Sequence, residues 1–160
     1  MKKVLFILSL ILLSACNDGN FDVPAFEFEE SVQQCGSYVF YRLNSESTEA
    51  MILEIPSVNF GSTAGENTIS INDSNKITYR IFNDGVDNNY FCQDLPPSTP
   101  KVIKELIAES GNFLITTIVD DTTTPITYSY DIVLKEVLFL DGEDQVYFET
   151  FNFATDLNVN

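Results

Sequence analysis

Polar and apolar residues alternate along most of this chain, and the alternation predicts β-strands. In residues 25–29, Phe26 and Phe28 share one face while glutamates occupy the other, which is typical of a half-buried strand. The same period of two, or a run rich in β-branched and aromatic residues, recurs in 36–43, 50–55, 68–71, 76–82, 113–119, 126–140 and 145–153. We therefore predict a single all-β domain of about eight or nine strands. An antiparallel β-sandwich is the expected architecture, with a β-barrel as the alternative.

Turn residues between these segments predict two hairpins. Residues 72–75 (Asn-Asp-Ser-Asn) lie between 68–71 and 76–82, and residues 141–144 contain the hairpin dipeptide Asp-Gly. The alternation within the last long strand changes phase at Lys135 and Glu136, so we expect a β-bulge there.

The stretch 101–109 is compatible with either a helix or a strand. Val102, Ile103, Leu106 and Ile107 recur at helical spacing, with Pro100 before them and Gly111 beyond. The same stretch also reads as one arm of a hairpin that turns at Gly111 and returns through 113–119. We favour the hairpin. The proline-rich break before it, 83–100, cannot be a central strand and should cross an edge or pass between sheets.

The first sixteen residues have the pattern of an export signal. Lys2 and Lys3 precede an apolar run at 4–13, and Ser14 and Ala15 lead to Cys16. This run is too short for a transmembrane helix, which needs about 20 apolar residues. Leu13-Ser14-Ala15-Cys16 resembles the lipobox of bacterial lipoproteins. The resemblance implies that residues 1–15 are a signal peptide and that Cys16 is lipidated, begins a short tether (16–24) and anchors a domain at 25–160.

The resemblance also implies a location. Asn17 stands where lipoproteins of the enteric type carry Asp for retention in the inner membrane, so we expect the outer membrane of the cell envelope. Whether the domain faces the periplasm or the cell surface remains open. The two further cysteines, Cys35 and Cys92, would enter an oxidising compartment, where such a pair normally forms a disulfide.

Charge narrows the classes of partner. The chain has 24 acidic and eight basic residues, a net charge of −16, and two of the basic residues lie in the expected signal. Nucleic acid is excluded as a partner because phosphate binding depends on Lys and Arg. A strongly negative surface favours cations, basic proteins or simply solubility.

Composition also narrows the chemistry. The chain has no histidine, which excludes catalytic triads that use it and, with so few cysteines, a structural zinc site. Asp84, Asp87 and Asn89 are weak calcium candidates in 83–89, although Asn, Asp and Gly are ordinary turn residues. Residues 141–144 are a weaker candidate still. We expect no catalysis, no metal and no cofactor.

These features predict a membrane-anchored lipoprotein that acts as a binding or structural module, with a protein partner in the envelope and loops as its contact surface. The mature domain resembles small envelope lipoproteins in character. The alternative is an acidic inhibitor of a basic lysozyme-like hydrolase, for which charge complementarity provides the physical reason. The alternation of the strand aromatics, among them Tyr128 and Tyr130, places half of them inward as core, and we expect the others to form ordinary β-surface. Phe91 should pack over the disulfide.

Overall fold

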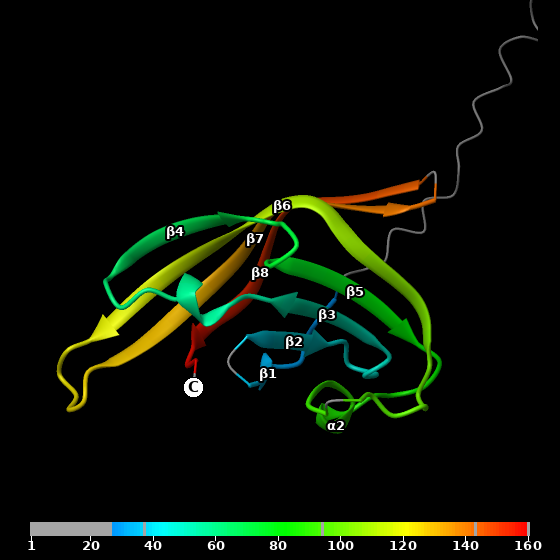
Figure 1. Cartoon of the computed structure of the whole chain (residues 1–160), viewed down its shortest axis with the longest axis horizontal. Helices are drawn as coiled ribbons and strands as arrows, with labels where there is room; N and C mark the ends of the chain where they lie inside the picture. The colour runs from blue at the N-terminus through cyan, green and yellow to red at the C-terminus, as the bar shows by residue number, and fades with distance from the viewer. Residues whose placement is uncertain (1–26, 37, 94, 143, 160) are drawn as a thin grey trace, which may run out of the picture.

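The computed structural model describes residues 27–36, 38–93, 95–142 and 144–159, with the backbone alone at 144, and these form an antiparallel β-sheet (Figure 1). The strands are β1 (Gln33–Cys35), β2 (Val39–Leu43), β3 (Glu49–Glu54), β4 (Gly65–Ser70), β5 (Lys76–Phe82), β6 (Val102–Asp120), β7 (Thr127–Asp141) and β8 (Asp144–Leu157), with a 3-10 turn η2 (Ser57–Asn59) and a short helix α2 (Asn88–Phe91). The predicted all-β fold with one disulfide is confirmed.

The sheet curls into a half-barrel because β6 belongs to both of its halves. The strand order is β1-β2-β3-β5-β6-β7-β8, and β4 pairs with β6 beside this path. The first part of β6 pairs with β5 and the second part pairs with β4, while β7 follows it from Ala108 onward. As a result, β2, β3 and β5 curve round to face β7 and β8 across the core (Figure 1).

The bend in β6 occurs at Gly111, where we had predicted a turn. The strand assignment of 101–109 is confirmed, but the hairpin that was to turn at Gly111 is wrong, because β6 continues through it as one strand of 19 residues. Gly111 has a φ of +142°, and a Cβ on it would lie 2.9 Å from Ile71 Cδ1 and from Val137 Cγ2. Glycine is therefore required both for the backbone conformation and for the close approach of its neighbours.

Two further predictions are corrected. The 72–75 turn exists, with Asn72 bridging Asn75, but the strands on either side separate beyond it, and β4 pairs with β6 instead of β5. The described part of 25–29 is not a strand, although Phe28 is buried as expected and packs edge-on against Tyr79 and Phe151. Phe26 lies outside the described residues.

The C-terminal hairpin agrees with the sequence. Asp141 pairs with Asp144 at the turn, as predicted. The β6–β7 register shifts between Ser110 and Asn112, opposite the expected bulge, and Glu136 has a φ of +52°. This bulge allows β7 to follow the bend that Gly111 makes in β6.

The core has two parts. The larger lies inside the curl and contains Phe40, Met51, Leu53, Ile77, Phe113, Ile115, Ile132, Leu134, Phe139 and Phe153, all 0% exposed, together with Tyr130 at 7%. The smaller lies on the outer face of β2, β3 and β5 and contains Tyr41, Ile52 and Phe82. The aromatics in and beside the strands divide between core and surface, as predicted: Phe40, Tyr41, Tyr130 and Phe153 are buried, Tyr128, Phe148 and Phe151 are partly buried, and Tyr38 and Tyr147 are exposed.

Candidate functional site

The segment after β5 covers the outer face of β2, and Cys35 and Cys92 hold it there. Their disulfide joins the end of β1 to the residue that follows α2, with the two Cα atoms 5.1 Å apart. Phe91 stacks on Tyr41, with ring centroids 4.0 Å apart, so it packs over that tyrosine and beside the disulfide. The expected disulfide is present. Val86, Tyr90 and Phe91, from the 83–100 break, pack over a sheet face that would otherwise be exposed, whereas Leu95 is exposed.

Beneath this cover lies Tyr41, whose pKa is strongly shifted by its surroundings. Its hydroxyl donates a hydrogen bond of 2.5 Å to Asn88 Oδ1, and its side chain is fully buried. Burial, and then the negative charge of Asp87, raises the pKa of Tyr41 to about 12. Tyr41 therefore stays neutral at ordinary pH and acts as a hydrogen-bond donor to α2.

The calcium candidates lie in this same segment, and each has a local structural role. Asp87 caps α2: its Oδ1 accepts from the Asn89 backbone N–H at 3.0 Å, and its Oδ2 accepts from Asn89 Nδ2 at 3.3 Å. Asp84 Oδ1 accepts from the Gly85 backbone N–H at 2.8 Å. These bonds are those of turn and cap residues. In the described part of the chain, no three Asp, Glu or Cys residues are placed to share a metal ion.

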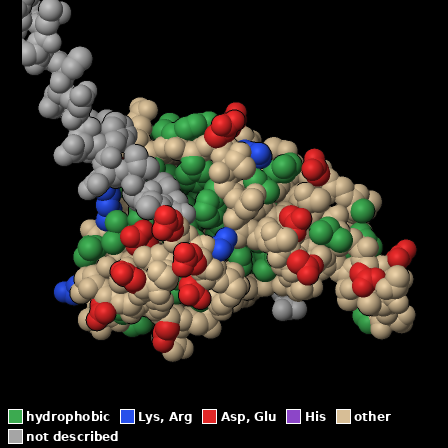
Figure 2. Space-filling model, turned by 180° about the vertical axis from the view of Figure 1, so that it is seen from behind, with side chains coloured by type: hydrophobic (Ala, Val, Ile, Leu, Met, Phe, Trp, Pro, Cys, Tyr) green, Lys and Arg blue, Asp and Glu red, His purple; other side chains and the backbone are tan. Residues whose placement is uncertain are grey.

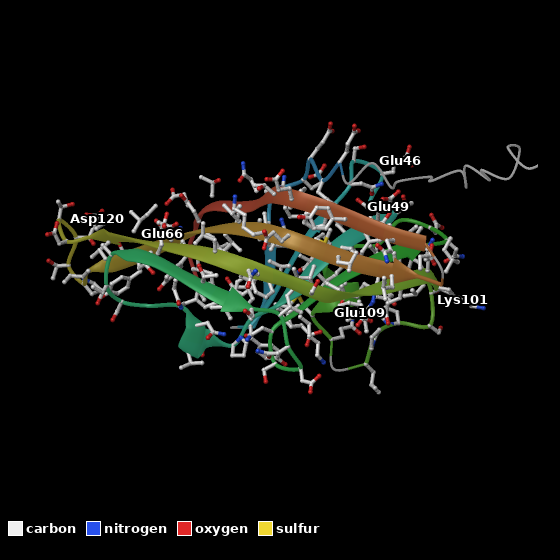
Figure 3. All side chains as sticks on the ribbon, turned by 90° about the horizontal axis from the view of Figure 1, so that it is seen from above. Glu46, Glu49, Glu66, Lys101, Glu109 and Asp120 are labelled. Atoms are coloured by element: carbon white, nitrogen blue, oxygen red, sulfur yellow. A yellow bond between two sulfur atoms is a disulfide. The ribbon has the colours of Figure 1, made fainter. Side chains whose placement is uncertain are left out.

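A second acidic feature lies at the end of the molecule where Figure 3 shows Glu46 and Glu49. Together with Glu27, Asn44 and Ser45 they line a shallow hollow of about 200 Å³. Glu49 accepts a 2.6 Å hydrogen bond from the hydroxyl of Tyr79, and burial followed by this bond and charge raises the pKa of Tyr79. The bond connects the hollow to the core, and its role is structural.

Arg42 closes the open side of the half-barrel, a role that the sequence did not reveal. Its guanidinium donates to the carbonyls of Phe28, Glu30 (2.9 Å), Asn152 (3.2 Å) and Phe153 (3.3 Å). These bonds join β2 to the segment before β1 and to the far edge of the sheet at β8. Partial burial lowers the pKa of Arg42.

A groove of about 360 Å³ follows this seam, lined by Ser31 and Val32 on one side and by 153–158 on the other, with Arg42 between them. The one feature of the sequence that could have indicated this role is the position of Arg42 in a short apolar strand, between Tyr41 and Leu43. A partly buried guanidinium at this position needs hydrogen-bond acceptors, and the backbone carbonyls at the rim of the sheet supply them.

Cys16, the predicted lipidation site, lies outside the described residues. Within the residues that the structure does describe, no helix is long and apolar enough to cross a membrane. Acidic side chains are spread over the face seen in Figure 2. A comparison with protein-family models found no match, and neither did comparisons with curated proteins and with solved structures.

Proposed function

We propose that this protein is a lipid-anchored lipoprotein of the bacterial cell envelope whose β-domain binds a partner and catalyses no reaction. The observation that carries the proposal is the sequence Leu13-Ser14-Ala15-Cys16 at the end of a short apolar run behind two lysines. The Cys35–Cys92 disulfide supports it, because such bonds persist in exported proteins.

The anchor requires more than one acyl chain. A single acyl chain binds a membrane only marginally, whereas two chains give stable attachment, so a diacylated Cys16 would hold the domain without a helix. The residues between Cys16 and Glu27 can extend at most about 3.5 Å each. The domain would therefore remain close to the lipid surface, and Asn17 favours the outer membrane.

Metabolic labelling with an alkyne fatty acid tests the anchor. Cells that express the wild-type chain should incorporate the label into the protein and retain it in the membrane fraction. Cys16→Ser should abolish both, while the matched control Cys35→Ala should keep the label. Labelling of Cys16→Ser, or a wild-type chain without label, would contradict the proposal.

A second candidate function is inhibition of a basic lysozyme-like hydrolase, and the net charge of −16 is the observation that favours it. Titration of a basic lysozyme at moderate salt should then reduce its muramidase activity in proportion to the inhibitor. Unchanged activity at a molar excess would exclude this candidate and leave the anchored binding module.

A further inference from the structure

Among the residues that the structure describes, the sheet has three edge strands, β1, β4 and β8, and two of them are protected against pairing with another chain. β1 is only three residues long. β8 has register shifts against β7 between Ile132 and Val133, and Arg42 occupies its carbonyls at Asn152 and Phe153. Short strands, bulges and blocking side chains are the devices by which proteins prevent edge-to-edge association.

β4 is the least protected of the three: one carbonyl on its open edge, that of Ser70, accepts a hydrogen bond from Asn72 Nδ2, and Glu66 is its one charged side chain. The strand runs for six residues, Gly65–Ser70, pairs with β6 in an unbroken register, and contains neither proline nor lysine. Because β5 separates from it after the 72–75 turn, its second edge faces outward, and Figure 1 shows β4 as the outermost strand of its half of the sheet.

The hydrogen-bond pattern shows which groups are available on this edge. The Ile71 N–H donates to the Gly111 carbonyl at 3.0 Å, so Ile71 and Gly111 form a hydrogen-bonded pair that continues the β4–β6 register. Antiparallel ladders alternate, so the residues directed at β6 are 65, 67 and 69, and the N–H and C=O groups of Glu66, Thr68 and Ser70 point to the open edge. The Ser70 carbonyl accepts a bond of 3.3 Å from Asn72 Nδ2, which agrees with that direction.

We propose that the open edge of β4 is a docking site for an extended segment of a basic partner protein, which adds as a further antiparallel strand. Main-chain hydrogen bonds to the N–H and C=O groups of Glu66 and Thr68 and to the N–H of Ser70 would supply the pairing, as in other cases of strand addition. This proposal rests on the binding role proposed above and not on the anchor at Cys16.

The side chains beside the edge define the chemistry of the partner. Glu66 is exposed, and it lies near the same end of the molecule as Asp120 (Figure 3), so a segment with Lys or Arg on its outer face is favoured. Ile69 packs against the main core on the inner face, opposite Phe113, so the alternate positions of the segment should be apolar. A second copy of this chain is the disfavoured occupant because each copy carries a net charge of −16.

The test uses the ¹⁵N-labelled full chain in detergent and, as the probe, an acetylated and amidated hexapeptide of alternating lysine and valine. We expect the peptide to shift the amide signals of Glu66, Thr68 and Ser70 and to slow their hydrogen exchange. Thr68→Pro removes an outward N–H without breaking a bond to β6, so it should weaken binding about tenfold, the value of one hydrogen bond. Thr68→Val keeps the N–H and should bind as the wild type does.

A fully N-methylated peptide of the same sequence separates strand pairing from charge attraction, and it needs no variant of the protein. It should not bind the wild-type chain. Equal binding of the two peptides, equal binding by Thr68→Pro and Thr68→Val, or signal shifts elsewhere than at β4 would overturn the proposal. Concentration-dependent shifts at β4 without peptide would identify a second copy as the occupant and would overturn the assigned partner. None of these outcomes affects labelling at Cys16.

Discussion

Replacing both Cys35 and Cys92 with alanine should lower the stability of the domain by an amount that follows from the length of the loop. The disulfide joins residues separated by 57 positions. In the chain-entropy account, opening a loop of this length returns about 14 cal/mol/K to the unfolded chain, or about 4 kcal/mol at 25 °C. For a domain of this size, each kcal/mol corresponds to about 2–4 °C, so the melting temperature should fall by about 8–16 °C.

The folded state should survive this loss. The cover also packs on the sheet through Phe91 on Tyr41, and Asn88 accepts the Tyr41 hydroxyl, so the variant should remain folded at room temperature. Thermal unfolding followed by circular dichroism measures the shift, with Cys16→Ser as a control that leaves the disulfide intact. A fall of less than about 2 °C would refute the reasoning, because the loop closure would then contribute almost nothing.

Three other changes have expected outcomes that urea unfolding can measure. Gly111→Ala should lower the free energy of unfolding by about 3 kcal/mol, because its φ is positive and the added Cβ would overlap Val137. Gly142→Ala also has a positive φ but no atom near its Cβ, so it should lower the free energy of unfolding by about 1 kcal/mol. Equal losses would contradict the role assigned to Gly111 in the bend. Arg42→Ala should cost about 3 kcal/mol because four carbonyls lose a charged donor, while Arg80→Ala, which breaks an exposed pair with Glu105, should cost less than about 1 kcal/mol. The pKa of Tyr41 is about 12, against 10.0 for an ordinary tyrosine, so its neutral form contributes stability that is fully present below pH 10 and is lost as the pH rises to about 12. Tyr41→Phe should therefore flatten the fall in the free energy of unfolding over that range, and an unchanged slope would count against this assignment.

Local alternation was enough to predict the fold class, because strands with one buried face show their period in the sequence. The last hairpin and the bulge near Glu136 followed from such local signals, whereas the disulfide followed from the number of cysteines and the expected export. The course of β6 could not be predicted, since a glycine with positive φ is equally suited to a turn and to a bend within one strand. Only its contacts with Ile71 and Val137, distant in sequence, distinguish the two.

Pairing between strands and contacts at the rim were also beyond the sequence. The turn at 72–75 favoured pairing of β4 with β5, but β6 is long enough to accept both strands at different positions along one edge. Arg42 donates to backbone carbonyls, which every residue has, so no particular residue type in the sequence could identify its partners. The open edge of β4 likewise depends on where β5 separates, and not on any motif in residues 65–70.

The measurement that tests the central claim most directly is the intact mass of the N-terminal peptide released from the membrane-bound protein. Our account predicts that this peptide begins at Cys16 and carries a diacylglycerol on sulfur, with residues 1–15 absent. The mass of an unmodified peptide that still contains Met1, or of one that begins beyond Cys16, would contradict the account.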